Sequence, residues 1–124
     1  LAVGTTEDTT ISRMTIVGQG DEHIVEQVEK QLNKVIPVIK VRSLGQDAAT
    51  AELLLVKVAC DPQTLGKVNE IAALMKAQVA DVSKSTVTLQ YAGEHDKCET
   101  LLDLLRPLGI REIARTGVIA LERG

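Results

Sequence analysis

The stretch Ser12–Leu44 decides the fold: it reads S-R-M-T-I-V, G-Q-G-D, E-H-I-V-E-Q-V-E-K-Q-L-N-K and V-I-P-V-I-K-V-R-S-L. In Ser12–Val17, Met14 and Ile16 point to one face of an expected strand. Apolar residues then recur at helical spacing, at Ile24, Val25, Val28, Leu32 and Val35. The Val- and Ile-rich run Ile36–Leu44 suits a mostly buried strand. The stretch therefore predicts a strand, a tight turn, a helix and a second strand.

The rest of the chain repeats this theme after one linker-like segment, Gly45–Ala51. We expect strands at Glu52–Cys60, Ala77–Val82, Thr86–Tyr91 and Ile110–Leu121, and helices at Thr64–Lys76 and Glu94–Arg106. Asp61-Pro62 is typical of a helix start. Gly117 inside the last strand indicates a bulge or a close backbone approach. The order βαββαβ is ferredoxin-like, so we predict an α+β chain of tandem ferredoxin-like units, 1–46 and 47–124.

The inward faces of the two later helices can also be predicted. They combine Leu65, Val68, Ala72 and Met75, with Ile71 beside them, and Cys98, Leu101, Leu102 and Leu105.

The first unit is incomplete in this sequence. A strand at Leu1–Gly4 precedes Ser12–Val17, so the order is ferredoxin-like without its first strand and first helix. In that fold the first strand lies between the third and the fourth, so Ser12–Val17 and Ile36–Leu44 would flank an empty lane of unpaired backbone groups. Either a segment before Leu1 fills the lane, or another chain does, or this half is poorly ordered. We expect the natural beginning of the chain to lie before Leu1.

Composition excludes several classes of function. The net charge of the 124 residues is −3, and positive and negative residues are interspersed. The sequence therefore shows no cluster of positive charge of the kind that binds nucleic acid or an anionic membrane. There is no Trp or Phe, and Tyr91 is the single Tyr, so base-stacking platforms are absent. Cys60 and Cys98 are expected to be reduced core thiols rather than a bridge or metal site, which implies a reducing compartment. No apolar run is long enough to span a membrane, and no signal peptide is present.

No catalytic or metal-binding constellation stands out. His23 and His95 each lie beside acids near a helix start, where a solvated position is favoured over a general base or ligand. Gly18-Gln-Gly20 is better read as a tight turn than as a phosphate loop, because acids follow it. Four arginines gather toward the C-terminus, as a solvated face or as the rim for an acidic partner: Arg106, Arg111, Arg115 and Arg123. We predict no catalytic, cofactor or metal residues, and a role in binding and assembly.

The chain resembles the small, regulatory subunit of acetolactate synthase (acetohydroxyacid synthase). The resemblance covers essentially the whole chain in five runs: S-R-M-T-I-V at Ser12–Val17, G-D-E-H-I-V-E-Q-V-E-K-Q-L-N-K at Gly20–Lys34, V-I-K-V at Val38–Val41, E-L-L-L-V-K-V at Glu52–Val58 and E-I-A-R-T-G-V-I-A-L-E-R-G at Glu112–Gly124. Pro37 departs from the family, where an acid or Asn is more usual.

The resemblance implies that 1–46 is an ACT domain lacking its first strand and helix, and 47–124 the family's C-terminal ferredoxin-like domain. Such subunits are non-catalytic, cytoplasmic and cofactor-free. They bind and activate a catalytic subunit that carries thiamine diphosphate, Mg and FAD, and they confer feedback inhibition by valine in branched-chain amino-acid biosynthesis. The effector lies between two ACT domains of a homodimer. The residues here that match its pocket wall are Leu1, Ala2, Val3 and Gly4.

Two other interpretations stay open. A free-standing ACT-type protein would sense an amino acid but act on a different partner. A small enzyme on the same fold would need a convergent polar cleft, in which His23 or His95 would be the simplest candidates.

Overall fold

The computed structural model describes residues 1–18, 22–35, 37–38 and 40–124, with the backbone alone at 22–24. The expected turn at 19–21 lies outside these residues. In chain order the elements are β1 (Ala2–Thr5), β2 (Ser12–Thr15), α1 (Glu22–Asn33), β3 (Ala49–Ala59), α2 (Leu65–Met75), β4 (Gln78–Val82), β5 (Thr86–Gly93), α3 (His95–Leu105), the 3-10 turn η1 (Arg106–Leu108), β6 (Ile110–Arg115) and β7 (Ile119–Leu121).

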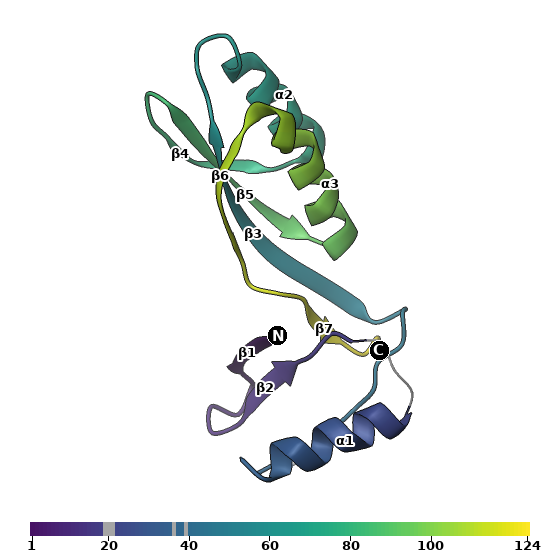
Figure 1. Ribbon diagram of the computed structural model, residues 1–124. Coiled ribbons are helices and arrows are strands. Elements are labelled where there is room, and N and C mark those ends of the chain that lie inside the picture. Colours follow the sequence, from purple (N-terminus) through teal and green to yellow (C-terminus); the bar gives the residue numbers. More distant parts are fainter. Residues whose placement is uncertain (19–21, 36, 39) are drawn as a thin grey trace.

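The second half is a sheet of order β4-β5-β3-β6 with both of its helices on one face (Figure 1). Every strand pair is antiparallel, and β3 lies between β5 and β6. The central place of the first strand and the order βαββαβ are those of a ferredoxin-like unit. The chain is therefore of the α+β class, as the sequence predicts.

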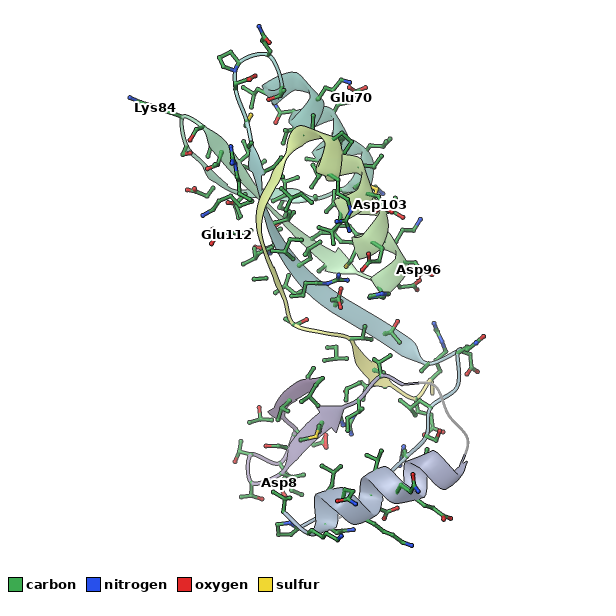
Figure 2. The ribbon with its side chains drawn as sticks, in the orientation of Figure 1. Asp8, Glu70, Lys84, Asp96, Asp103 and Glu112 are labelled. Atoms are coloured by element: carbon green, nitrogen blue, oxygen red, sulfur yellow. The ribbon has the colours of Figure 1, made fainter. Side chains whose placement is uncertain are left out.

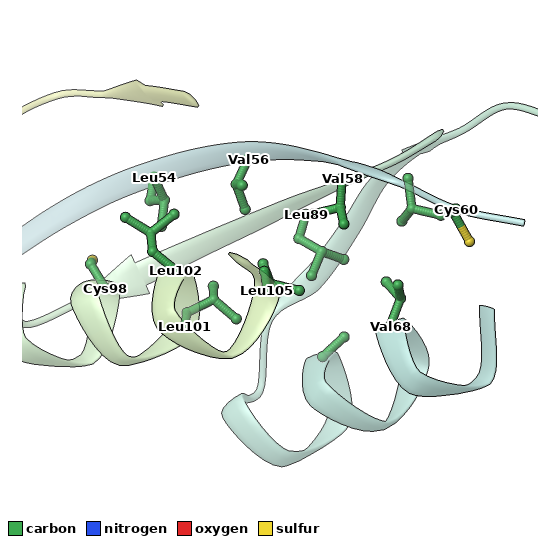
Figure 3. Close-up of a cluster of buried hydrophobic side chains, with 12 residues drawn as sticks. Leu54, Val56, Val58, Cys60, Val68, Leu89, Cys98, Leu101, Leu102 and Leu105 are labelled. Atoms are coloured by element: carbon green, nitrogen blue, oxygen red, sulfur yellow. The ribbon is translucent and has the colours of Figure 1, made fainter. Parts of the chain in front are cut away.

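The core fills the space between this sheet and its helices (Figure 3). Alternate residues of β3, namely Leu54, Val56 and Val58, are fully buried because they share the face that the helices cover. On α3 all four predicted inward residues are buried, as are Val68 and Ala72 on α2. The prediction for Leu65 is wrong: it is 41% exposed, in the first turn of α2.

The first half has a two-stranded antiparallel hairpin, β1–β2, and the helix α1. The predicted strand at Ile36–Leu44 is wrong for the residues that are described, because 37–38 and 40–44 are in no strand. A strand exists only where its N–H and C=O groups find a partner, and Pro37 has no N–H to offer. No described side chain in residues 1–48 is buried, and Val35 is 81% exposed.

The predicted last strand, Ile110–Leu121, is two strands. Both β6 and β7 pair with β3, but three residues, 116–118, lie opposite two, 52–53. That one-residue excess is a bulge, and it falls at Gly117, as expected. The predicted linker Gly45–Ala51 is also shorter than expected, because residues 49–51 belong to β3 and pair with β7.

Candidate functional site

A cluster of charged side chains joins β3, β6 and the start of α3. Arg115 donates from Nη2 and Nε to Oε1 of Glu52 at 2.5 and 3.0 Å, and from Nη1 to Glu99 at 2.7 Å. The Glu52 side chain is only 4% exposed. This carboxylate lies on the helix-covered face of β3, in line with Leu54, and Arg115 lies within hydrogen-bonding distance of it on the adjacent strand. The charged cluster therefore ties the two strands to the helix.

His95 also belongs to the charged cluster. Its Nδ1 lies 3.7 Å from Oε2 of Glu52, and its Nε2 lies 3.7 Å from Oε1 of Glu99. The ring is half-exposed, which agrees with the predicted polar position at a helix start, and its Nδ1 also lies 3.3 Å from Nη2 of Arg115, so its neighbours are an ion-paired guanidinium and two carboxylates. The side chain of His23 lies outside the described residues.

The electrostatics of the charged cluster favour fixed ion pairs over reactive groups. Burial raises the pKa of the Glu52 carboxyl, but the hydrogen bonds and charge of Arg115, with smaller contributions from Cys98 and His95, outweigh it and lower the pKa overall. Burial and the adjacent Glu52 raise the pKa of the Cys98 thiol to about 11. A thiol with that pKa is protonated at neutral pH and is a poor nucleophile.

The role of Glu52 was not predicted, and Arg115 was expected on a solvated face or at the rim for an acidic partner. Its guanidinium is instead paired with Glu52 and Glu99 of the same chain, and its side chain is 26% exposed. The available signal was the period of β3: Glu52 occupies the same face as the buried Leu54 and Val56. A carboxylate in such a position needs a cation. Of the other predicted arginines, Arg106 pairs with Asp103 at 3.3 Å. Figure 2 shows Glu70 and Lys84 pointing away from the body of the second half.

A second candidate site is a hollow of about 550 Å³ between β1, the start of β3 and β7. Three residues of the predicted effector wall, Ala2, Val3 and Gly4, line it, whereas Leu1 does not. The lining is largely apolar, and its polar members are threonines with one acid and one base, Glu7 and Arg13. Such a lining suits a small molecule with an apolar body and a few polar groups.

The outer edge of β1 is open. Within the described residues β1 pairs with β2 alone, so its other side presents unpaired N–H and C=O groups. An edge of this kind can accept another strand.

The described residues offer neither a metal-binding cluster nor a membrane-spanning helix. In the described part of the chain no three His, Cys, Asp or Glu side chains are grouped to hold a metal ion. Cys60 and Cys98 are buried and free, as predicted. Among the described residues, every helix is too short or too polar for a membrane crossing.

Known protein families match both halves of the chain. The family described as the small subunit of acetolactate synthase matches residues 51–124. The family described as the ACT domain like that of the acetohydroxyacid synthase small subunit matches residues 1–40.

Individual relatives match the whole chain. The acetolactate synthase small subunit of Mycolicibacterium smegmatis is 46% identical over 125 residues, covering 100% of this chain and 74% of that protein. The Bacillus subtilis small subunit is 44% identical over 126 residues, covering 100% and 73%. A crystal structure of the Thermotoga maritima small subunit has a TM-score of 0.88 at 30% identity, over 99% of this chain and 78% of that one. The chain belongs to the family of acetolactate synthase small subunits.

Proposed function

We propose that this chain is a non-catalytic regulatory subunit that binds the catalytic subunit of acetolactate synthase, raises its activity and makes it sensitive to valine. The observation that carries the proposal is the identity of 44–46% with proteins named as this small subunit, over the whole chain. The name of a small subunit implies a larger partner.

The non-catalytic part of the proposal is supported by the state of the titratable groups. Glu52, Glu99 and Arg115 are paired with one another, and Cys98 is buried and protonated at neutral pH. A general base or nucleophile needs a group free to exchange its proton with a substrate. In the proposed holoenzyme the catalytic subunit carries thiamine diphosphate, Mg and FAD, and this chain carries none of them.

The effector part of the proposal concerns the first half. We assign residues 1–46 to the ACT domain and 47–124 to the C-terminal domain, with valine bound between two ACT domains of a homodimer. The open edge of β1 supports a homodimer, because a second copy could pair with it. Leu1, Ala2, Val3 and Gly4 would form one wall of that pocket, whereas the hollow lined by Ala2, Val3 and Gly4 lies within one chain, against β3 and β7. Buried free thiols support a cytoplasmic location.

The experiment is a titration of the full-length subunit into a catalytic subunit loaded with thiamine diphosphate, Mg²⁺ and FAD. Acetolactate formation is measured with and without valine. We expect activity to rise with added subunit and valine to lower it only when the subunit is present. Unchanged activity contradicts the proposal. Valine binding without any effect on the synthase would instead favour a free-standing amino-acid sensor.

A matched pair of variants tests the pocket wall. Val3→Asp places a charge in the apolar wall of β1, whereas Leu74→Asp places one on α2, where Leu74 is 76% exposed. We expect Val3→Asp to raise the valine concentration for half inhibition by about tenfold or more, since couplings between sites are commonly of this size. Leu74→Asp should leave that concentration unchanged. Equal responses in the two variants would remove Val3 from the pocket.

A further inference from the structure

The segment 116–123 touches both halves of the chain, and its first residues fix the bulge. Thr116 donates its backbone N–H to the Leu53 carbonyl at 3.1 Å, and its hydroxyl oxygen accepts the Leu53 N–H at 3.1 Å. The same hydroxyl donates to the carbonyl of Gly117 at 2.7 Å. The bulge is therefore held by three hydrogen bonds and re-aims the chain as it leaves β6.

Gly117 lies close to the start of the first half. Its φ is +81°, in the region that favours glycine, and a Cβ at this position would lie 3.1 Å from the Leu1 carbonyl oxygen. A side chain would therefore be strained by its own backbone conformation and would also press on the backbone that leads into β1.

Two further contacts follow the bulge. Arg42, in the segment after α1, pairs through Nη1 with Oε2 of Glu122 at 2.7 Å. Arg123 donates from Nε to the carbonyl oxygen of Asp47, just before β3 begins. Between the bulge and these contacts, β7 pairs with the first residues of β3.

From these contacts we infer that residues 116–123 act as a latch that holds the β1–β2 hairpin and the segment after α1 against the second half. Its key position is Gly117. The latch lies on β3, whose later residues Leu54, Val56 and Val58 form the centre of the core. A displacement of β1 is thereby passed to the strand on which both helices of the second half pack.

The contacts of the latch differ in strength. Arg42 and Glu122 are both more than half exposed, and exposed ion pairs contribute little. The backbone approach at Gly117 cannot be kept by any residue with a Cβ unless its neighbours shift. We therefore expect Gly117→Ala to weaken the latch more than any change at Glu122.

Amide hydrogen exchange tests the latch on this chain without any partner. Gly117→Ala should make the amides of β1 and β2 exchange about tenfold faster, because the hairpin detaches more often, while α3 and β5 stay protected. Gly66→Ala is the matched control: Gly66 lies in α2 with nothing within 4 Å of an added Cβ. Equal hairpin exchange in the two variants would overturn the inference.

A charge swap gives a second measurement if Gly117→Ala fails to fold. Glu122→Arg places two cations together and should speed exchange in the hairpin about twofold to threefold. Adding Arg42→Glu should restore the original rate. If the exchange rates of the hairpin amides are the same in both variants as in the unchanged chain, the latch is contradicted.

A role of the latch in regulation rests on the proposed function. In the synthase assay Gly117→Ala should then weaken inhibition by valine relative to Gly66→Ala. A full-length subunit that fails to activate the catalytic subunit at all contradicts the proposed function, whereas the exchange data judge the latch by itself.

Discussion

Residues 1–48 contain no buried side chain among those described, whereas residues 52–105 supply all the buried ones. Yet both halves have amphipathic helices and strands of alternating pattern. In the second half α2 and α3 pack against a sheet whose central strand is β3. In the first half the described strands form a sheet of two, β1 and β2, and Val28 on the apolar side of α1 is 38% exposed.

An apolar pattern therefore contributes stability only where a sheet is wide enough for the helix to pack against it. An isolated helix of the length of α1 is marginal in water, and packing supplies most helical stability in proteins. In the second half the apolar faces of the helices form a core because the sheet around β3 covers them.

The largest expected contrast is between leucines on the two kinds of helix. Leu102→Ala on α3, where Leu102 is 1% exposed, should lower the free energy of unfolding by about 4 kcal/mol, because it leaves a cavity. Leu32→Ala on the half-buried face of α1 should cost at most about 1 kcal/mol. Urea denaturation followed by circular dichroism measures both. Equal losses would show that the first half is as well packed as the second.

The next contrast concerns ion pairs. Arg115→Ala leaves the Glu52 carboxylate buried without a cation and should cost about 2–3 kcal/mol, somewhat below the usual value for a buried pair because Arg115 is partly exposed. Lys57→Ala breaks an exposed pair with Glu112 on the open face of the sheet and is the control. Its urea midpoint should match that of the unchanged chain. A midpoint for Arg115→Ala that also matches would contradict an anchoring role.

The smallest expected effect is the pH dependence that Glu52 contributes. The folded-state pKa of its carboxyl is below the ordinary value of 4.5, so the unfolded chain binds more protons between those two values. The stabilisation is complete above about pH 4.5 and is lost as pH falls through the folded pKa. Urea midpoints between pH 7 and pH 3 should therefore decline less steeply in Glu52→Gln than in the unchanged chain. Parallel declines would remove Glu52 as a source of acid sensitivity.

The second half could be predicted from sequence because its elements carry local signals. The apolar faces of α3 and β5 follow from their periods, and Asp61 caps the turn before α2 by accepting from the N–H groups of Gln63 and Thr64. The predicted strand at Ile36–Leu44 failed because pairing depends on a partner, which a local pattern does not contain.

The candidate sites were harder to predict for the same reason. Glu52 and Arg115 are 63 positions apart, so no spacing links them, although the period of β3 marks Glu52 as an inward acid. The bulge was predicted from Gly117 alone. The approach of Gly117 to Leu1 was not, because the two residues lie near opposite ends of the chain and no local pattern links them. The assignment of Leu1–Gly4 to an effector wall stays a prediction.

Native-state hydrogen exchange on the unchanged chain measures whether stability resides in the second half. We expect the slowest amides in β3, β5 and α3, at residues such as Val56, Leu89 and Leu102, which open only with global unfolding. Amides of β1, β2 and α1 should exchange at least about a hundredfold faster through local opening. Similar protection in both halves would show that the first half is as stable as the second.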